Sequence, residues 1–398
     1  MASPLTNGLL LVANPGSASR KYALYDADLT LRAQLHFELT DDVLMCTLHV
    51  SDESHQIPLD FESLQQSAAH LVSILQSERI IEQGEHIALI GLRVVAPSAY
   101  FMHDHVITDE VVAKLEEVHD LAPLHISATL DELKLLRAAF NDATIVGVSD
   151  SAFHATKPNY AWNYGIDIHD ADRFDIKRFG YHGLSVEAAV DHLWNAGKLA
   201  PKVIVCHLGS GSSVTGVFHG RSIDTTMGFT PLEGVIMATR SGSIDAGAVR
   251  ALKRAMNMDD DQIEEYLHTK GGLMGLGGSN DLRALIDREA AGDHFAHLAL
   301  STLIHSLHKA IGEMLVSLNG ADILVFTGTI GERSAYLRRR IVAHLEFTDF
   351  ILDGVTNDEC IAPLKMHRIS QPAKSRPIFV IPTDESLEIA KHAKNAVK

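Results

Sequence analysis

The pattern of apolar and polar positions divides the chain into strand-like and helix-like segments. Short apolar runs rich in β-branched and aliphatic residues predict strands at 9–13, 22–25, 87–95, 144–148, 203–207, 214–218, 323–326 and 378–381. Apolar residues that recur every three to four positions predict helices at 61–82, 108–119, 127–140, 184–196, 259–268 and 294–318. Strands that alternate with helices in this way predict an α/β architecture.

Two stretches about half a chain apart repeat one another. Residues 11–19 read LVANPGSAS and residues 204–212 read IVCHLGSGS. In each copy an apolar run meets a polar residue, Asn14 or His207, and a Gly/Ser turn leads into another strand-like run. A lone turn of this kind is usually only a turn, or it can be an anion cradle of backbone N–H groups, from which Pro15 removes one donor. The matched copies predict two domains that open with the same hairpin and face each other across a cleft.

Two further segments are rich in glycine. The apolar run 323–326 leads into a small-residue loop at 327–331, and a predicted helix follows with Ser334 as its N-cap. A glycine loop that runs into a helix N-terminus accepts phosphate or lets a flat ring approach the backbone. Residues 271–283, GGLMGLGGSNDLR, lie between predicted helices, and we expect a loop that packs closely against another part of the chain.

Length and charge narrow the class of protein. A chain of 398 residues predicts two domains. The net charge of −17 disfavours nucleic acid as a partner. No apolar stretch approaches the ~18 residues that span a bilayer, and the apolar start of the chain resembles a buried strand more than a signal peptide. Three scattered cysteines indicate a reducing compartment, so we expect a cytoplasmic protein without membrane contact; they are Cys46, Cys206 and Cys360.

Charged residues near predicted strands are the first candidates for chemistry. Arg93 and Arg240 lie in or beside buried-looking segments, where an arginine needs an anionic partner, either an aspartate in a structural ion pair or a ligand. Asp150 ends a strand where a carboxylate often faces a ligand, although it could equally cap a turn. Glu385 opens the last helix, where the helix dipole stabilises an acid whatever its function.

Two histidines are weaker candidates. His182 is flanked by glycine and is therefore accessible to a ligand, and His125 follows the segment APL. Lone histidines are more often core or surface residues. Together with the glycine loops, the arginines and carboxylates form the set that phosphoryl transfer requires. The chain lacks G-x-x-x-x-G-K-[ST] and the protein-kinase motifs, so a phosphotransferase of another type is one possible interpretation.

The chain resembles the acetate kinase family over nearly its whole length. The strongest stretch is residues 205–249, and shorter ones lie at 14–19, 121–125, 150–154, 179–183, 272–278 and 381–385. The resemblance implies two domains of the duplicated ribonuclease-H-like fold of actin, Hsp70 and sugar kinases, with mixed five-stranded sheets and an interdomain cleft. It implies an N-terminal acetokinase domain at 1–150 plus the C-terminal helix 385–398. A nucleotide-binding and dimerisation domain would occupy 151–384.

The resemblance also implies an activity. A homodimer would transfer a phosphoryl group reversibly and in line from ATP to acetate, or to propionate, giving acetyl phosphate and ADP with Mg²⁺ or Mn²⁺. Arg93 and Arg240 would hold the carboxylate and the transferred group with their planar guanidinium forks. His182 would add a hydrogen bond in the transition state. Because a carboxylate nucleophile is already ionised at pH 7, no strong general base is needed.

The residues of this chain at the family's functional positions fall into four groups. The resemblance gives Asp150, Arg93, Arg240 and His182 as catalytic, Arg93, Val95, Leu124 and Pro231 as substrate-binding, Asn14 and Glu385, with Asp150, as metal-binding, and Lys21, His207, Gly209, Ser210, Gly211, Asp281, Arg283, Gly328, Ile330 and Gly331 as ATP-binding, with His125 near the phosphates.

Four segments depart from the usual family pattern. LRVVAPS at 92–98 replaces HRVVHGG, ASRK at 18–21 replaces SSLK, Ser210 replaces asparagine, and GTIGER at 328–333 replaces AGIGEN. These departures keep two alternatives open. One is an acyl kinase with another acid or phosphoryl donor, such as butyrate or pyrophosphate. The other is a nucleotide-binding relative with weakened catalysis.

Overall fold

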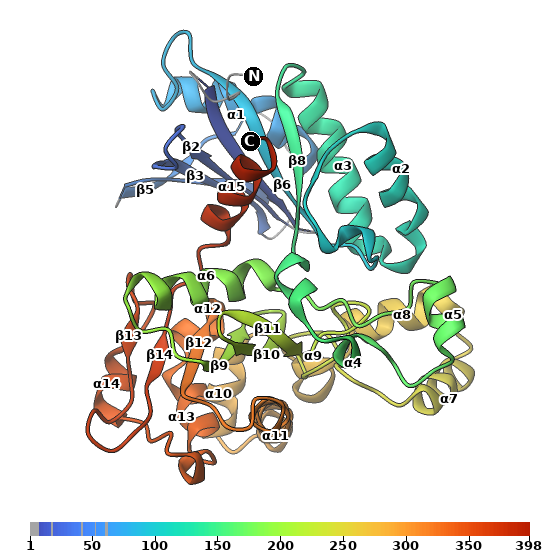
Figure 1. The fold of residues 1–398 in the computed structure, drawn as a ribbon, viewed down its shortest axis with the longest axis vertical. Helices are drawn as coiled ribbons and strands as arrows, with labels where there is room; N and C mark the ends of the chain where they lie inside the picture. Colours follow the sequence, from blue (N-terminus) through green and yellow to red (C-terminus); the bar gives the residue numbers. More distant parts are fainter. Residues whose placement is uncertain (1–7, 17–18, 41–42, 52, 60–62) are drawn as a thin grey trace. The chain divides into compact units, whose positions relative to one another are not determined.

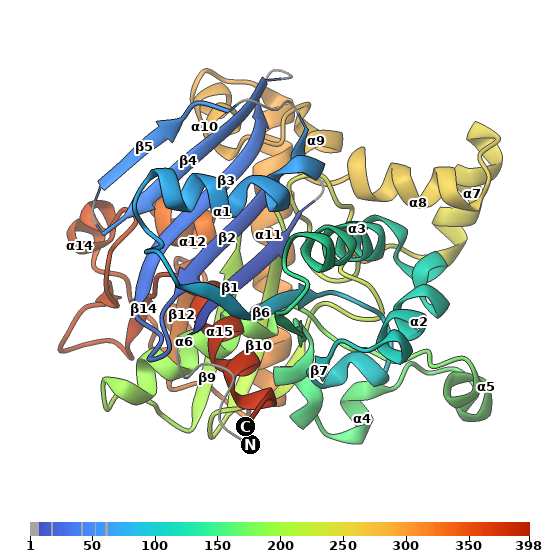
Figure 2. The same cartoon turned by 90° about the horizontal axis from the view of Figure 1, so that it is seen from above.

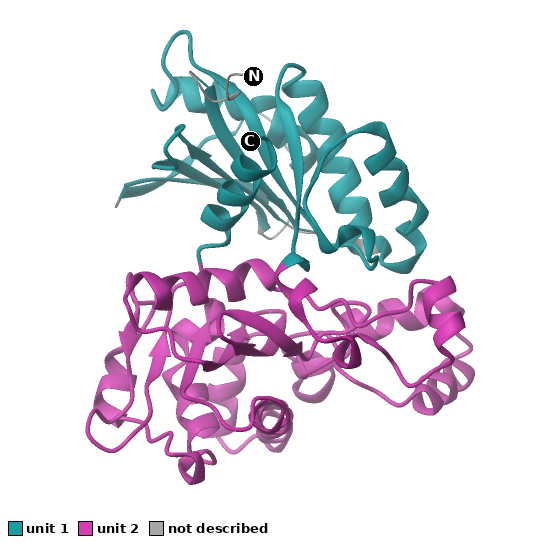
Figure 3. Cartoon of the chain, viewed as in Figure 1, with its two compact units in different colours: residues 1–152, 384–398 teal, residues 153–383 magenta. Residues whose placement is uncertain are grey.

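The computed structural model describes residues 8–16, 19–40, 43–51, 53–59 and 63–398, without the side chains of Thr40 and Leu124. The chain forms two compact units (Figure 3). Unit 1 consists of Met1–Ala152 and Asp384–Lys398, and unit 2 of Phe153–Thr383. Each unit contains one mixed sheet of its own, so the predicted α/β class with two sheets is confirmed.

Unit 1 is built on an eight-stranded sheet in the order β5-β4-β3-β2-β1-β6-β8-β7. Its strands are β1 (Gly8–Pro15), β2 (Ser19–Tyr25), β3 (Leu31–Thr40), β4 (Val43–Val50), β5 (Glu53–Ile57), β6 (His86–Val94), β7 (His105–Val106) and β8 (Thr144–Ser149). Strands β1 to β5 form an antiparallel meander, whereas β1, β6 and β8 run parallel. The carboxyl ends of these three parallel strands therefore meet at one edge of the sheet.

Helices cover both faces of this sheet. They are α1 (Ser67–Ser77), α2 (Asp109–Glu117), α3 (Pro123–Ala139) and α15 (Glu385–Ala396). Leu11 and Leu92 pack into one core with residues of α1 and α3, and Figure 2 shows α1 in front of the strands. Successive side chains alternate between the faces of a strand, so Val12 and its partner Gly91 face the other way, toward α15 (Figure 1).

Gly91 permits the close approach of α15. A Cβ atom at this position would lie 2.8 Å from Cγ2 of Ile389 and 3.1 Å from Cβ of Ala393. Both residues of α15 are fully buried. Helix α15 also packs against β8 and β1, so this last helix of the chain completes the fold of unit 1.

Unit 2 repeats the strand order of unit 1. Its sheet runs β11-β10-β9-β12-β14-β13. The strands are β9 (Lys202–Leu208), β10 (Ser212–Phe218), β11 (Arg221–Thr225), β12 (Ile323–Thr327), β13 (His367–Arg368) and β14 (Ile378–Val380). Five strands correspond pairwise in order and direction, β3-β2-β1-β6-β8 with β11-β10-β9-β12-β14. The two matched Gly/Ser segments are the turns β1–β2 and β9–β10, although Ser17 and Ala18 lie outside the described residues.

The helices of unit 2 again cover both faces of its sheet. They are α4 (Asn159–Trp162), α5 (Ile168–Arg173), α6 (Gly183–Asn195), α7 (Ala246–Met256), α8 (Asp260–Thr269), α9 (Gly272–Gly277), α10 (Leu282–Ala290), α11 (His294–Ser317), α12 (Gly328–Arg333), α13 (Ala335–Val342) and α14 (Gly354–Glu359). Helix α11 packs with Ile204 and Cys206, and α6 packs with Val203 and Val205 on the opposite face. None of the described helices is both long and apolar enough to cross a bilayer.

Three predictions need correction. The sheets have eight and six strands rather than five, because β4, β5 and β7 extend the first and β13 the second. Residues 271–283 are not a loop, since α9 occupies Gly272–Gly277. Residues 327–331 are not a loop either, because α12 begins at Gly328. The expected close packing of the first segment is real, because a Cβ atom on Gly277 would lie 2.7 Å from Leu285.

Candidate functional site

Four of the expected site residues lie together in unit 1, at the carboxyl ends of β1, β6 and β8. The register pairs Val12 with Gly91, so Asn14 and Arg93, two residues further along, emerge on the face that α15 covers. Asp150 directly follows β8, and its N–H donates to the carbonyl oxygen of Val94 at 3.0 Å. Glu385 is the first residue of α15. The parallel strands and the last helix thus deliver four polar side chains to one place.

The guanidinium of Arg93 connects this group. Its Nε donates to Oδ1 of Asp150 at 3.2 Å, and its Nη2 lies 3.0 Å from Oδ2, a two-pronged pair. Its Nη1 donates to Oδ1 of Asn14 at 3.3 Å and lies 3.9 Å from Oε2 of Glu385. The amide of Asn14 in turn donates to that Glu385 oxygen at 3.3 Å. A single cation therefore orders two carboxylates and an amide.

Burial strengthens the electrostatics of this group. The side chain of Asp150 is 1% exposed, and those of Arg93 and Glu385 are 20% and 18% exposed. Burial acts to lower the pKa of Arg93, but the charges of Asp150 and Glu385 and the hydrogen bond to Asp150 raise it above its ordinary value. The arginine is therefore held as a cation whose outer edge can meet an anion.

The same group fits a divalent cation. Asn14, Asp150 and Glu385 offer amide and carboxylate oxygens, which are the hard ligands that Mg²⁺ prefers. Two of these donors are partly exposed, so an ion retaining several waters has access to them. The donor chemistry thus agrees with the metal-binding role expected for Asn14 and Glu385.

A second set of contacts, which sequence reasoning missed, supports Asp150. Asp104 accepts a hydrogen bond from the N–H of Ser149 at 2.9 Å, and its other oxygen lies 2.6 Å from Nδ1 of His392 on α15. Asp104 therefore ties the end of β8 to the helix that carries Glu385. The spacing of residues in the sequence does not predict the contacts of Asp104 with Ser149 and His392, which lie far from it along the chain.

The remaining candidates of unit 1 lie on β2, just after β6 and on α3. Lys21 is exposed on β2 directly opposite Asn14 in the strand register. Val95 is half-buried just after β6. Leu124 and His125 lie in the first turn of α3, where the side chain of Leu124 is outside the described part of the chain.

A group of histidines forms the corresponding place in unit 2. His182 is the N-cap of α6 and adopts the left-handed backbone region at φ 60°, which is uncommon for a residue other than glycine. Its Nδ1 lies 3.0 Å from Oγ of Ser213, and its ring lies 4.1 Å from that of His207. His207 is held by Oγ of Ser185 at 2.7 Å. Such strain concentrates at functional sites, where the surroundings enforce it.

Arg240 joins this group across the second Gly/Ser turn. An added Cβ atom on Gly211 would lie 3.2 Å from both Nη1 of Arg240 and Nε2 of His182. Nη1 of Arg240 also donates to the carbonyl oxygen of buried Pro231 at 3.2 Å. Gly211 thus leaves room for a cation and an imidazole to lie side by side above the turn.

The charge of Arg240 also acts on a histidine. His268 in α8 is almost fully buried, and burial together with the nearby Arg240 cation lowers its pKa to about 4. Its imidazole is therefore neutral at pH 7.

The other residues expected to bind ATP fall into two places. Gly209 is buried and Ser210 exposed in the β9–β10 turn, while Gly328, Ile330 and Gly331 belong to α12. Gly328 has φ 79°, and an added Cβ atom would lie 2.7 Å from the carbonyl oxygen of Leu208, so the start of α12 packs directly on the end of β9.

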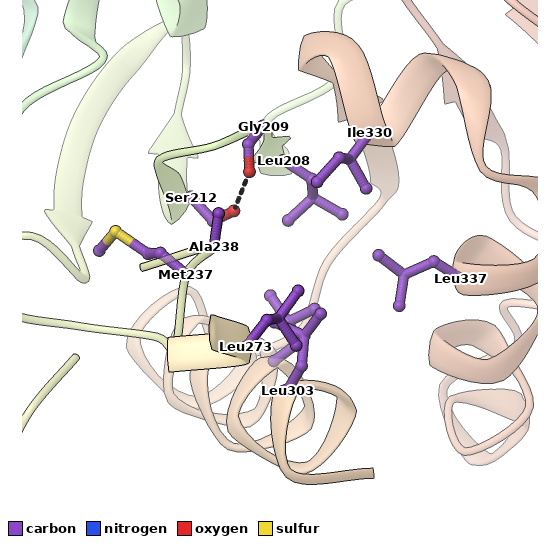
Figure 4. A pocket seen from close by; sticks show the side chains of 10 residues that line it. Leu208, Gly209, Ser212, Met237, Ala238, Leu273, Leu303, Ile330 and Leu337 are labelled. Carbon is purple, nitrogen blue, oxygen red and sulfur yellow. Dashed lines mark hydrogen bonds between the residues drawn. The ribbon is translucent and has the colours of Figure 1, made fainter. Parts of the chain in front are cut away.

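Gly209 and Ile330 border a small apolar pocket (Figure 4). It is otherwise lined by Leu208, Ser212, Met237, Ala238, Leu273, Leu303, Leu307 and Leu337. Its volume of about 10 Å³ admits roughly one water molecule, so this pocket is not itself a nucleoside site.

Asp281 and Arg283 form a separate pair at the start of α10. They pair with each other at 3.3 Å at the start of α10, where Asp281 also accepts the N–H of Arg283. The hydrogen bonds from Arg283 lower the pKa of Asp281. Ser185 and Ser213, in contrast, were missed as partners of the histidines. The hairpin register, which places Ser213 opposite His207, is the signal that could have found one of them.

Comparison with known proteins decides the family. Residues 9–391 match the Acetokinase family. The chain belongs to this family. An acetate kinase of Dichelobacter nodosus (strain VCS1703A) is 37% identical over 389 residues, which cover 96% of this chain and 97% of that protein. An acetate kinase of Clavibacter sepedonicus is 36% identical over 392 residues, 97% and 98% of the two chains.

Solved structures of acetate and propionate kinases have the same fold as this chain. A propionate kinase from Francisella tularensis subsp. tularensis SCHU S4 superposes with a TM-score of 0.87 at 31% identity, covering 98% of this chain and 99% of that one. The Porphyromonas gingivalis acetate kinase gives 0.85 at 30% identity, covering 98% and 100%. As an acetokinase-family member, the chain is a phosphotransferase that acts on a carboxyl group and uses ATP as co-substrate.

Proposed function

We propose that this acetokinase-family protein transfers the γ-phosphoryl group of ATP reversibly to acetate or propionate, giving the acyl phosphate and ADP. Relatives named acetate kinase and propionate kinase match nearly the whole chain. The observation that carries the proposal is the Arg93 group, in which one guanidinium orders Asp150, Asn14 and Glu385. A scaffold without catalysis has no need for such a costly arrangement of buried charge.

The reaction proceeds as one in-line displacement. A carboxylate oxygen of the acid attacks the γ-phosphorus, the new oxygen–phosphorus bond forms, and the bond to the oxygen bridging to the β-phosphorus breaks, so that ADP leaves with that electron pair. The attacking carboxylate carries no proton at pH 7, so no side chain has to remove one. Catalysis then depends on positioning and charge neutralisation.

Arg93 and Arg240 supply the charge neutralisation. Arg93, whose Nε and Nη2 are held by Asp150, binds the acid carboxylate with the remaining edge of its guanidinium. Arg240 and His182, side by side above Gly211, donate to the equatorial oxygens of the transferred group as charge develops there. The serine partner of His182 fixes the orientation of its ring.

Asn14, Asp150 and Glu385 would hold Mg²⁺ or Mn²⁺. The bound cation would supply charge to the donor phosphates and to the leaving ADP. The chain's own contribution is the geometry of the three oxygen donors around Arg93.

The substrate pockets follow the family positions. Val95, Leu124 and Pro231 would line a small apolar space for the acyl methyl group. Lys21, His207, Gly209, Ser210, Gly211, Asp281, Arg283, Gly328, Ile330 and Gly331 would contact ATP, with His125 near the phosphates. The cysteines Cys46, Cys206 and Cys360 are free and buried, in agreement with a cytoplasmic protein.

The protein acts as a homodimer in this proposal. Large apolar side chains of unit 2 are more than four-fifths exposed in the single chain, among them Val316, Phe347 and Leu364. The dimer is carried over from the family resemblance, and these exposed side chains are available for contact with a second subunit.

One activity matrix tests the function. Purified protein with Mg²⁺ is assayed against acids of two to four carbons with ATP, GTP and pyrophosphate as donors, and acyl phosphate is trapped as the hydroxamate. We expect turnover with ATP and acetate or propionate. Turnover only with butyrate or only with pyrophosphate would replace the substrate assignment, and ATP binding without any product would leave a nucleotide-binding relative.

A further inference from the structure

A buried ion pair lies in unit 1 beside the proposed site but outside it. Nε of Arg20 lies 2.9 Å from Oε2 of Glu132, and the two side chains are 5% and 0% exposed. The other oxygen of Glu132 accepts the hydroxyl of Tyr22 at 2.7 Å, and that hydroxyl also lies 2.9 Å from Oγ of buried Ser67. The network joins β2, α3 and α1 in the interior of the unit.

The second prong of Arg20 reaches the first Gly/Ser turn. Its Nη1 donates to the carbonyl oxygen of Gly16 and, at 3.3 Å, to that of Ser19. The Ser19 oxygen also accepts the N–H of Gly16 at 2.9 Å, which closes the turn. Arg20 thus fixes both described flanks of the turn, two residues beyond Asn14.

The partner of Arg20 belongs to another part of the site. Glu132 lies on α3, the helix whose first turn carries Leu124 and His125. Through the ion pair, the turn that follows Asn14 and the helix that carries Leu124 and His125 are connected by one buried contact. Each strand or helix could otherwise shift independently by the fraction of an ångström that matters for in-line transfer.

Stability alone does not account for the pair. Two charges taken out of water lose hydration that their attraction barely recovers, and apolar residues of similar volume are often as stable or more so. A pair of this kind is better explained by the geometry that it specifies.

We propose that Arg20 is a positioning residue, which together with Glu132 holds Gly16 and Ser19, the described flanks of the first Gly/Ser turn, in the geometry required for phosphoryl transfer. This inference rests on the proposed function. It predicts that the pair can be exchanged for apolar residues without loss of stability, but not without loss of turnover.

The test compares single and double variants of the full chain. Arg20→Leu and Glu132→Leu alone each leave an uncompensated buried charge, and we expect a lower melting temperature. The double variant Arg20→Leu/Glu132→Leu is expected to melt within a few degrees of the wild type. Its kcat should nevertheless stay at least ~10-fold lower, with KM for the acid changed less than about threefold, as expected for a group that acts on the reacting geometry.

Hydrogen exchange gives a readout that is independent of activity. In the double variant the peptide containing Gly16 and Ser19 should exchange at least ~10-fold faster than in the wild type. Arg20→Lys keeps the charge but not the two-pronged guanidinium. Compared with Arg20→Leu, it should recover more of the melting temperature than of kcat. The matched control Arg32→Leu/Glu85→Leu removes a half-buried pair of unit 1 at 2.8 Å, and it should change neither kcat nor this peptide.

A double variant with wild-type kcat and wild-type exchange overturns the proposal. The proposal is also overturned if the loss of kcat and the faster exchange of the double variant are fully explained by its lower melting temperature. If the wild type makes no acyl phosphate, the proposed function fails, and the exchange rate still decides whether Arg20 fixes the turn.

Discussion

Arg93 can form a structural ion pair and at the same time bind an anionic ligand. From the sequence, an arginine at the end of a buried strand needed either a structural aspartate or an anionic ligand. The structure provides the aspartate, since Asp150 pairs with two of its nitrogens. The third, Nη1, lies between Asn14 and Glu385, whose oxygens would also serve a cation. In the proposed function, this structural pair therefore also orients the guanidinium toward the acid substrate.

Replacement of Arg93 by lysine tests this preparation. A lysine keeps the charge but cannot pair with both Asp150 oxygens and Asn14 together. We expect kcat/KM for the acid to fall about 100- to 1,000-fold, on the order of 3 to 4 kcal/mol, in the hydroxamate assay. Arg137→Lys, at an exposed pair with Asp109, is the control and should behave as the wild type.

Arg240→Ala probes the corresponding cation of unit 2. Loss of a transition-state arginine typically lowers kcat by ~10³-fold or more, and the circular dichroism spectrum should not change because Arg240 is only half-buried. Arg250→Ala, an exposed arginine of α7, serves as the matched control. Near-normal turnover of the Arg240 variant would remove this residue from the mechanism.

His268 gives unit 2 a pH-dependent stability. Its pKa is lowered to about 4 by burial and by Arg240, whereas the unfolded value is about 6.5. The unfolded chain therefore binds the additional proton between these values, and stability falls as pH drops from about 6.5 to about 4. The loss is at most on the order of 3 kcal/mol.

Denaturation at pH 7, 5.5 and 4.5 measures this effect. The wild type should lose stability over the acid range more steeply than His268→Gln, which has no group to protonate there. If the stability of the two proteins changed with pH in the same way, His268 would not be the group responsible.

At the scale of elements, the packing of α15 on the sheet depends on the absence of a side chain at Gly91. Gly91→Val would force β-branched atoms against Ile389, which already lies 2.8 Å from an added Cβ. We expect a loss of about 1 to 3 kcal/mol in stability and a marked fall in kcat, because Glu385 opens the displaced helix. A second change, Ile389→Ala, should restore part of the lost stability and part of the lost kcat.

A glycine with open space provides the comparison for that experiment. Gly312 lies within α11 and an added Cβ would meet nothing within 4 Å. Gly312→Ala should therefore raise stability by about 0.5 to 1 kcal/mol and leave turnover unchanged. A loss of stability there would show that the space around α11 is not open.

Elements buried on both faces were predictable from the sequence. β1, β6, β9 and β12 read as continuous apolar runs because helices cover both sides of them. In contrast, β3, β4 and β5 were missed. β3 alternates apolar with polar residues instead of forming a continuous apolar run, β4 is largely half-buried, and four of the five residues of β5 are exposed. Helices α9 and α12 were missed because their glycines lower helix propensity, which close packing overrides.

The site was predictable only in part. Residues that the strand ends deliver, such as Asn14, Arg93 and Asp150, follow from the positions of the strands together with the family resemblance. Their partners do not, because Asp104 and His392 meet across 288 residues of chain. Arg20 stood out in the sequence only as a departure from the usual pattern, and its buried partner Glu132 gave no signal at all.

For the molecule as a whole, light scattering checks the proposed homodimer. One chain has a mass of 43.4 kDa, so a dimer should elute with about twice that mass at micromolar concentration. The mass should not change with salt, since association through apolar side chains such as Phe347 and Leu364 is little screened. A single-chain mass at all concentrations would contradict the dimer.

The return of α15 to unit 1 determines the order in which the chain can fold as the ribosome makes it. Strands β1 to β8 are synthesised first, yet the helix that covers Gly91 and Val12 is made only after all of unit 2. At 5–20 residues per second this delay is on the order of tens of seconds. During that time one face of the first sheet lacks its cover. Nascent chains of this protein should therefore need a chaperone at their N-terminal half, although unit 2 can already be complete.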